Sequence, residues 1–135
     1  MYNFCALCNS DLEQEGDRYR CASCGYFQYP FDASIPISPK EAKKEADNGA
    51  LLLDVREQYE YDITHLQDSK LIPLKHLKER LKDIPKDKEI LAYCHHGFRS
   101  FFAAQFLKQH GFNARSVTGG IEAWSLEVDQ SVKRY

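Results

Sequence analysis

The sequence predicts an α/β protein in which a parallel sheet with helices on both faces follows a small metal-bound module. Short apolar runs alternate with stretches of helical spacing through residues 34–135. The apolar run 51–55 is typical of a strand that is covered on both faces. Four cysteines near the N-terminus form two C-x-x-C pairs. We therefore divide the chain into a module at 1–33 and an α/β domain at 34–135.

Composition places the chain among ordinary globular proteins, with 43% hydrophobic and 28% charged residues. Its formal net charge of −2 creates no global field that would attract nucleic acid or a membrane surface. No apolar stretch approaches the roughly 20 residues that span a membrane. Residues 1–5 lack the basic and apolar regions of a signal peptide. We therefore expect a cytoplasmic protein.

The four N-terminal cysteines have the spacing of a structural zinc site. Cys5 pairs with Cys8 and Cys21 pairs with Cys24, and the twelve residues 9–20 separate the pairs. Two such knuckles at the ends of a hairpin supply four thiolates in the tetrahedron that zinc takes in closed structural sites. Because about thirty residues bury too little apolar surface to fold alone, we expect the metal to supply folding energy.

Residues around the cysteines agree with a zinc ribbon. Asn9 and Gly25 follow the second cysteine of each pair, where a positive φ must be tolerated. The segment 10–16 is polar and turn-like, whereas 18–20 and 26–29 have the composition of short strands. Redox dithiols or disulfides are the alternative, and they would need an oxidising compartment or a thioredoxin-like context. Four thiolates leave no open position for a catalytic water.

The stretch from Phe4 to Pro30 resembles the zinc ribbon at the head of some Nudix hydrolases and in many nucleic-acid-related proteins. The rest of the chain contains nothing similar to a Nudix catalytic box, so nucleotide hydrolysis is not implied. Nucleic-acid binding is disfavoured because the module's five acidic residues face only Arg18 and Arg20.

Aromatic residues of the module are expected to cover its small core or to dock it on the second domain. They are Tyr19, Tyr26, Phe27, Tyr29 and Phe31. Residues 30–34 form the expected linker, and its short length predicts contact between the two modules.

Residues 34–49 are expected to form an edge strand and the first helix. Pro36 confines the strand to an edge because proline cannot donate a ladder hydrogen bond. The run 38–41, Ser-Pro-Lys-Glu, has the pattern of a capping box with proline at the first helical position. The helix should end near Asn48 and Gly49.

The remaining elements continue the alternation that predicts a parallel doubly wound sheet. Leu74, Leu77 and Leu81 recur at helical spacing. The other expected elements are strands at 51–55, 71–73, 89–93 and 114–117, an acidic helical turn at 57–61, a helix from about 99 to 110, and a last helix that begins at Gly119-Gly120.

The candidate reactive residue is the fifth cysteine, Cys94, which stands apart from the expected metal ligands. It ends a predicted strand and precedes a helix, where an open α/β sheet usually places its ligand. The loop that follows, His95-His96-Gly97-Phe98, can aim successive backbone amides at the cysteine sulfur. Those amides and the helix dipole can favour the thiolate, which is the nucleophilic form.

Five blocks spread over residues 34–126 together resemble a single-domain rhodanese. They are 52–57 (Leu-Leu-Asp-Val-Arg-Glu), Tyr61 with His65, 72–74 (Ile-Pro-Leu), 93–100 (Tyr-Cys-x-x-Gly-x-Arg-Ser), and 119–124 (Gly-Gly-Ile-x-Ala-Trp). The resemblance implies a rhodanese-like fold and a sulfurtransferase without an organic cofactor. Its cysteine, here Cys94, would take a sulfane sulfur from a small donor such as thiosulfate as a persulfide. A thiol or cyanide would then accept that sulfur. Asp54 and Arg56 would have mainly structural roles.

The loop residues suit sulfur transfer because the thiolate and the persulfide are both anions. Gly97 lets the backbone approach the sulfur closely. Arg99 is a candidate to bind an anionic donor through its planar fork, and a salt bridge to a carboxylate is its alternative role. His95 and His96 could donate hydrogen bonds to the donor or could be solvated loop residues. Phe98 and Ser100 complete the expected substrate-binding set.

Two other functions remain open. Phosphatases and arsenate reductases on the same scaffold have a C-x₅-R loop, whereas only four residues separate Cys94 from Arg99. The shorter loop suits a single sulfur atom better than a tetrahedral oxyanion. A non-enzymatic persulfide carrier, or an adaptor that docks on a partner protein through the zinc ribbon, is compatible with an intact Cys94.

Overall fold

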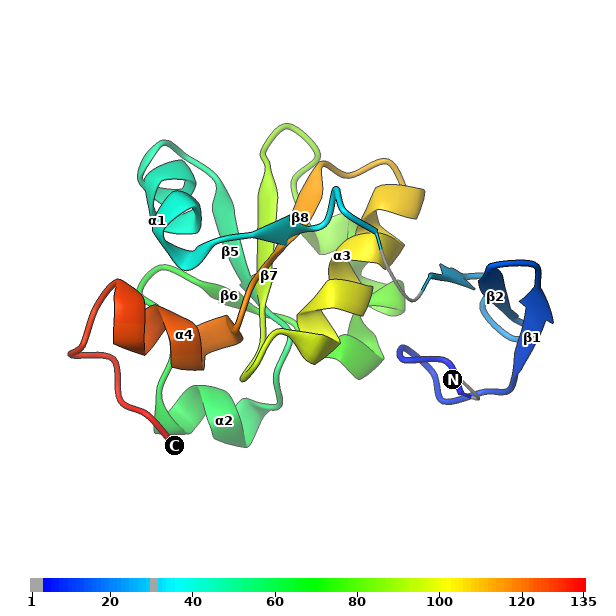
Figure 1. Cartoon of the computed structure of the whole chain (residues 1–135), viewed down its shortest axis with the longest axis horizontal. Coiled ribbons are helices and arrows are strands. Elements are labelled where there is room, and N and C mark those ends of the chain that lie inside the picture. Colours follow the sequence, from blue (N-terminus) through cyan, green and yellow to red (C-terminus); the bar gives the residue numbers. More distant parts are fainter. Residues whose placement is uncertain (1–3, 30–31) are drawn as a thin grey trace.

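The computed structural model describes residues 4–29 and 32–135. They form a three-stranded antiparallel sheet and a five-stranded parallel sheet (Figure 1). Pro30 and Phe31 of the expected linker lie outside the described residues, as do residues 1–3. Within the described ranges, no helix has the length and apolar character needed to cross a membrane.

The N-terminal module is built on strands β1 (Leu12–Glu15), β2 (Arg18–Cys21) and β3 (Phe27–Gln28). The expectation of a turn-like segment at 10–16 is wrong, because β1 pairs with β2 along its whole length. Its polar residues are held by charge across the strands: Arg20 forms ion pairs with Glu13 at 3.2 Å and with Glu15 at 2.8 Å. Asn9 and Gly25 have the expected positive φ angles, 62° and 71°.

The larger sheet has the order β4-β8-β7-β5-β6, and all its strand pairs are parallel. Its strands are β4 (Pro36–Ile37), β5 (Leu51–Asp54), β6 (Lys70–Leu71), β7 (Ile90–Tyr93) and β8 (Ala114–Val117). β4 lies at an edge, as Pro36 predicts. The two apolar strands β5 and β7 pair in the middle of the sheet.

Four α-helices accompany this sheet in the described part of the chain: α1 (Pro39–Asp47), α2 (Gln58–Ile63), α3 (Phe98–Gln109) and α4 (Gly120–Glu127). At the start of α1, the Ser38 hydroxyl accepts the amide of Glu41 at 3.2 Å, which is the Ser38 half of the predicted capping box. The α1 helix ends at Asp47 and is followed by the capping residue Asn48 and by Gly49 with φ 109°, as expected.

The leucine-spaced segment after β6 forms two 3₁₀ turns, η1 (Leu74–His76) and η2 (Lys78–Asp83), which corrects the expectation of one helical element. Spacing of three between Leu74 and Leu77 matches the three-residue period of a 3₁₀ turn. Arg80 interrupts the run with non-helical angles, φ −117° and ψ 22°. Ile84 is extended, as is usual before a proline.

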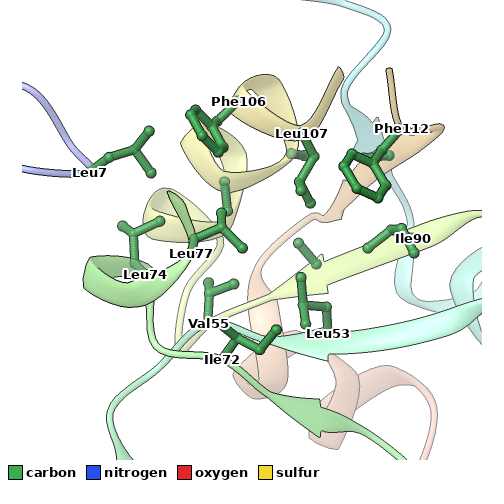
Figure 2. Close-up of a cluster of buried hydrophobic side chains, with 14 of the residues drawn as sticks. Leu7, Leu53, Val55, Ile72, Leu74, Leu77, Ile90, Phe106, Leu107 and Phe112 are labelled. Atoms are coloured by element: carbon green, nitrogen blue, oxygen red, sulfur yellow. The ribbon is translucent and has the colours of Figure 1, made fainter. Parts of the chain in front are cut away.

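Alternate residues of the central strands point into two separate hydrophobic clusters. Leu53 of β5 and Ala92 of β7 belong to the cluster beneath α3, whereas Leu52 and Leu91 belong to the cluster with Trp124 of α4. The period of two therefore places helices on both faces of the sheet, as predicted. Figure 2 shows the first cluster, with Leu53 and Ile90 on the sheet and Phe106 and Leu107 on α3.

The α3 helix is covered on a second side by the N-terminal module, and most of its residues are buried. Tyr26 is 1% exposed, and its hydroxyl donates to Gln105 Oε1 at 2.7 Å. Gln105 Oε1 also accepts the Tyr29 amide at 3.0 Å. Leu7 extends toward Leu74 in the same cluster (Figure 2). The predicted contact between the modules is therefore made through α3.

Replacing Tyr26 with phenylalanine should weaken this contact. The variant loses a buried hydrogen bond, and we expect the free energy of unfolding to fall by about 1 kcal/mol. Urea denaturation at fixed metal content measures the change. Tyr59→Phe is the matched control because Tyr59 is 66% exposed. An unchanged urea midpoint for Tyr26→Phe would contradict this account of the contact.

Candidate functional site

The sulfur of Cys94 lies at the carboxyl end of β7 inside a cradle of hydrogen-bond donors. The amide of Gly97 donates to Sγ at 3.1 Å, the amide of Ser100 donates to it at 3.3 Å, and the thiol in turn donates to the Ser100 hydroxyl oxygen at 3.4 Å. Cys94 is only 1% exposed. Both amides lie at the start of α3, so the positive end of the helix dipole also faces the sulfur. This arrangement stabilises negative charge on one sulfur atom.

Two glycines allow the loop to take this shape. Gly97 has φ 97°, and a Cβ added there would lie 3.0 Å from the Gly119 nitrogen. A Cβ at Gly120 would lie 2.4 Å from the carbonyl oxygens of both Cys94 and His95. The start of α4 therefore packs directly against the loop that follows Cys94. Its Ile121 amide donates to the Cys94 carbonyl at 2.9 Å.

Arg99 forms a two-pronged salt bridge with Glu60 of α2. Its Nη1 donates to Oε1 at 2.8 Å and its Nη2 donates to Oε2 at 3.1 Å. This is the alternative role that the sequence left open for Arg99. Burial acts to raise the pKa of Glu60, but hydrogen bonds from Arg99, the Glu57 amide and Tyr135 outweigh it and lower the pKa to about 2. The guanidinium therefore ties α2 to the loop.

Tyr135 joins this ion pair to a second, fully buried one. Its hydroxyl donates to Glu60 Oε2 at 2.8 Å and accepts from Arg56 Nη1 at 2.7 Å. Arg56 in turn pairs with Asp54 at 2.7 Å, and neither side chain is exposed. Burial raises the pKa of Tyr135 to about 12; the hydrogen bond from Arg56 acts to lower this pKa, and the hydrogen bond to Glu60 acts to raise it. Asp54 and Arg56 thus have the structural role that the resemblance implied.

The two histidines lie against each other at the mouth of the loop. The ring centroids of His95 and His96 are 4.0 Å apart, and the ring of Tyr135 stacks on His95 at 3.9 Å. Burial, together with the neighbouring His96, lowers the pKa of His95. Phe98 is 68% exposed and packs edge-on against Phe102 at 5.3 Å. The rings of His96, His95 and Tyr135 therefore form one stack, whereas Phe98 remains largely exposed.

The four N-terminal cysteines converge on one point. Their sulfur atoms all lie within 4.8 Å of one another, with separations of 3.8 Å for Cys5–Cys24 and 3.4 Å for Cys8–Cys21. A tetrahedral zinc with Zn–S bonds of about 2.3 Å requires sulfur separations of about 3.8 Å. The amides of Leu7 and Cys24 donate to Cys5 and Cys21 at 3.4 Å. Four sulfurs so placed could hold a metal.

The structure thus brings residues 94–100 together in one loop and the four cysteines in one cluster. Sequence reasoning missed Glu60 and Tyr135. Glu60 lies in the predicted acidic turn, but Tyr135 carries no local signal because its partner Glu60 is 75 residues away in the chain. The sequence left open a salt bridge from Arg99 to a carboxylate, and the fold identifies that carboxylate as Glu60.

A family model, related sequences and solved structures all relate this chain to the same kind of protein. A family model described as "Rhodanese-like domain" matches residues 38–127. Thiosulfate sulfurtransferase GlpE of Pseudomonas syringae is 33% identical over 95 residues, which cover 70% of this chain and 90% of that protein. A crystal structure of a rhodanese-related protein from Thermoplasma volcanium has a TM-score of 0.66 and 34% identity, and the match covers 70% of this chain and 93% of that one.

Several relatives are much longer than this chain. Adenylyltransferase and sulfurtransferase MOCS3-2 of Zea mays is 36% identical over 112 residues, which cover 76% of this chain and 23% of that protein. Adenylyltransferase and sulfurtransferase UBA4 of Candida glabrata is 34% identical over 147 residues, which cover 99% of this chain and 31% of that protein. The chain therefore spans about a quarter to a third of these relatives. The resemblance of its ribbon to that of Nudix hydrolases stays a prediction.

The salt bridge between Glu60 and Arg99 should make stability depend on pH in a defined window. Because the folded pKa of Glu60 is about 2 against an ordinary 4.5, its contribution is complete above pH 4.5 and disappears as the pH falls toward 2. We expect Glu60→Gln to lower the free energy of unfolding on the order of 2 kcal/mol at pH 6. That deficit should shrink to near zero at pH 2.

Urea denaturation of both proteins at several pH values measures this difference. Protonation of the cysteine cluster affects both proteins equally, so it cancels in the comparison. Asp62→Asn, on the exposed side of α2, is the control and should behave like the parent at each pH. A deficit for Glu60→Gln that is constant from pH 6 to pH 2 would refute the assigned cause.

Proposed function

This chain belongs to the Rhodanese-like domain family, and we propose that it acts as a rhodanese-type sulfurtransferase. It moves a sulfane sulfur from a donor such as thiosulfate to a nucleophilic acceptor. The observation that carries the proposal is the convergence of the Gly97 and Ser100 amides and the Ser100 hydroxyl on the single sulfur of Cys94. Similarity to GlpE, a thiosulfate sulfurtransferase, supports the same reaction.

The reaction proceeds in two displacements at sulfur. The Cys94 thiolate attacks the outer sulfur of thiosulfate, the S–S bond of the donor breaks, and sulfite leaves with the bonding electron pair. The product is a Cys94 persulfide, which carries one negative charge. A thiolate or cyanide then attacks the outer sulfur, and the Cys94 thiolate leaves. Thiolate and persulfide are both anions, so the same amides and helix dipole stabilise each of them.

Arg99 acts in this proposal as a positioning residue. Two N–H groups of its guanidinium are committed to Glu60, whose negative charge also offsets the field that a free arginine would offer an anionic donor. The salt bridge fixes the first turn of α3 against α2. Because the Ser100 amide lies in that turn, Arg99 helps to hold the cradle around the sulfur. Binding of the donor then depends mainly on backbone amides and on the exposed loop residues.

We infer that the four N-terminal cysteines bind one structural zinc ion. Three of their sulfur separations, 3.4 to 4.0 Å, bracket the value expected for a tetrahedral thiolate site, and all four sulfurs lie within 4.8 Å of one another. The donor set of four thiolates closes the coordination shell, so the ion serves folding rather than catalysis. Cys5, Cys21 and Leu7 belong to the same cluster as the core beneath α3, so the ion would anchor the module on that helix.

A persulfide carrier that docks on a protein partner is the second candidate. A groove of about 640 Å³ lies between the module and the loop, and Leu7, Lys78 and Phe98 line it. A partner bound there would lie beside the mouth of the Cys94 loop. The long relatives, named as adenylyltransferases and sulfurtransferases, contain the matched region as a minor part of their length. Such an arrangement would supply the sulfur donor or acceptor from a protein rather than from solution.

Incubation with thiosulfate should add one sulfur atom to Cys94. Intact-protein mass spectrometry should show this addition in the native protein and none in Cys94→Ser, and cyanide should then remove the sulfur as thiocyanate. Equal labelling of Cys94→Ser would mean that the N-terminal cysteines react instead, which would overturn the proposal. If thiosulfate fails but a cysteine desulfurase loads Cys94, the carrier is favoured.

The purified protein should contain one zinc ion per chain. Cys21→Ser, which removes a fully buried sulfur, should lower the zinc content and the free energy of unfolding together. Elemental analysis and urea denaturation measure the two quantities, and Cys94→Ser should keep its zinc. A metal-free protein with an unchanged urea midpoint would exclude a structural role for the ion.

A further inference from the structure

The hydroxyl of Ser116 lies one hydrogen bond behind the sulfur of Cys94. Ser116 is on β8, which pairs with β7, the strand that ends beside Cys94. Its Oγ is 2.7 Å from the Oγ of Ser100, which is 3.4 Å from the Cys94 sulfur. Ser100 is fully buried and Ser116 is 3% exposed. A chain of two buried hydroxyls therefore runs from the sheet to the sulfur.

The direction of this chain depends on the charge of the sulfur. In the neutral thiol, Cys94 Sγ donates to Ser100 Oγ. An anionic sulfur has no proton to donate, so the Ser100 hydroxyl then turns its proton toward the sulfur. Over residues 4–29 and 32–135, the Ser116 hydroxyl has Ser100 as its hydrogen-bond partner and no other. Because a buried hydroxyl that fails to donate loses free energy, Ser116 donates its proton to Ser100 when the sulfur is an anion.

We propose that Ser116 is a positioning residue for the sulfur chemistry of Cys94, because it orients the Ser100 hydroxyl as a donor to the anionic sulfur. A donor that is held in place by a second hydroxyl stabilises the charge that appears on the sulfur. Each hydroxyl also polarises the next, which strengthens the last bond of the chain. The proposal rests on the assignment of Cys94 as the reactive residue in the proposed function.

The placement of Ser116 in the sheet makes this orientation rigid. Its amide donates to the Ile35 carbonyl at 2.7 Å, and it pairs with Ala92 of β7 in the register of the sheet. Its neighbour in the chain, Val117, is buried in the apolar cluster on the other side. A serine at a buried position of an otherwise apolar region has no packing advantage over alanine or valine. Its hydrogen bond to Ser100 is therefore the property that distinguishes it.

Titration of the Cys94 thiol tests the proposal without requiring turnover. The rate of alkylation by iodoacetamide is followed against pH on the peptide that contains Cys94, so the other cysteines do not interfere. Ser116→Thr and Ser116→Val have the same shape and differ in the hydroxyl. We expect Ser116→Thr to keep the native pKa of Cys94, and Ser116→Val and Ser116→Ala to raise that pKa by about half a unit. Near pH 6, such a shift slows alkylation about threefold.

The charged and titratable groups around the loop stay in place in all these variants. They are Glu60 of α2, Arg99 of α3, Glu122 of α4, His95 and His96 of the loop, and Tyr135. A shift in the titration of Cys94 therefore reports the hydroxyl chain. Ser125→Ala is the matched control, because it removes another serine hydroxyl that is 3% exposed and that donates to the Val132 carbonyl at 2.7 Å. It should leave the titration unchanged.

A double-mutant cycle decides whether Ser116 acts through Ser100. Ser100→Ala alone should raise the pKa of Cys94 at least as much as Ser116→Ala does, and the double variant should raise it no further. Additive shifts would overturn the proposal, and so would a native titration for both Ser116→Val and Ser116→Ala. The titration is independent of the donor, so a native protein that fails to take sulfur from thiosulfate would refute the proposed function while the cycle still reports on Ser116.

Discussion

The close approach of α4 to the Cys94 loop is the constraint on which the site depends. Gly120 lies so near the carbonyls of Cys94 and His95 that any side chain would collide with them. This contact lets the first amides of α4 bind the outer carbonyls of the loop, which turns the loop's own amides inward. The same turn joins β8 to α4, so Ser116 and the loop keep a fixed relationship. The loop can therefore hold its amides around the sulfur because residue 120 has no Cβ atom.

Formal charge near the sulfur is largely neutralised within the protein. Arg99 is paired with Glu60, Arg56 is paired with Asp54, and Tyr135 connects the two pairs. The sulfur is instead surrounded by dipoles, from two amides and a hydroxyl. Dipoles fixed in a buried site stabilise an anion without binding it as tightly as a free cation would. This moderate stabilisation suits a sulfur atom that Cys94 must first accept and then give up.

Sequence patterns predicted the elements that have a local signal, such as a continuous run of apolar residues or a glycine at a helix boundary. The apolar runs of β5 and β7 indicated buried strands, and Gly119-Gly120 marked the start of the last helix. β1 was missed because cross-strand ion pairs, rather than apolar alternation, hold its polar residues. Leucines three apart satisfy both the α-helical and the 3₁₀ pattern, so the sequence indicates one helical element where the structure has two 3₁₀ turns. Cys94 and its loop were local in sequence, whereas Glu60, Ser116 and Tyr135 reach the site only through the fold.

The two outer strands of the larger sheet offer little backbone for pairing between copies of the chain. β4 and β6 are each two residues long, and β4 contains Pro36. An edge this short offers few free backbone groups, and proline removes one donor from it. The most apolar strands, β5 and β7, are both interior in the sheet order. The fold therefore keeps its most apolar strands away from the sheet edges, where edge-to-edge aggregation would start.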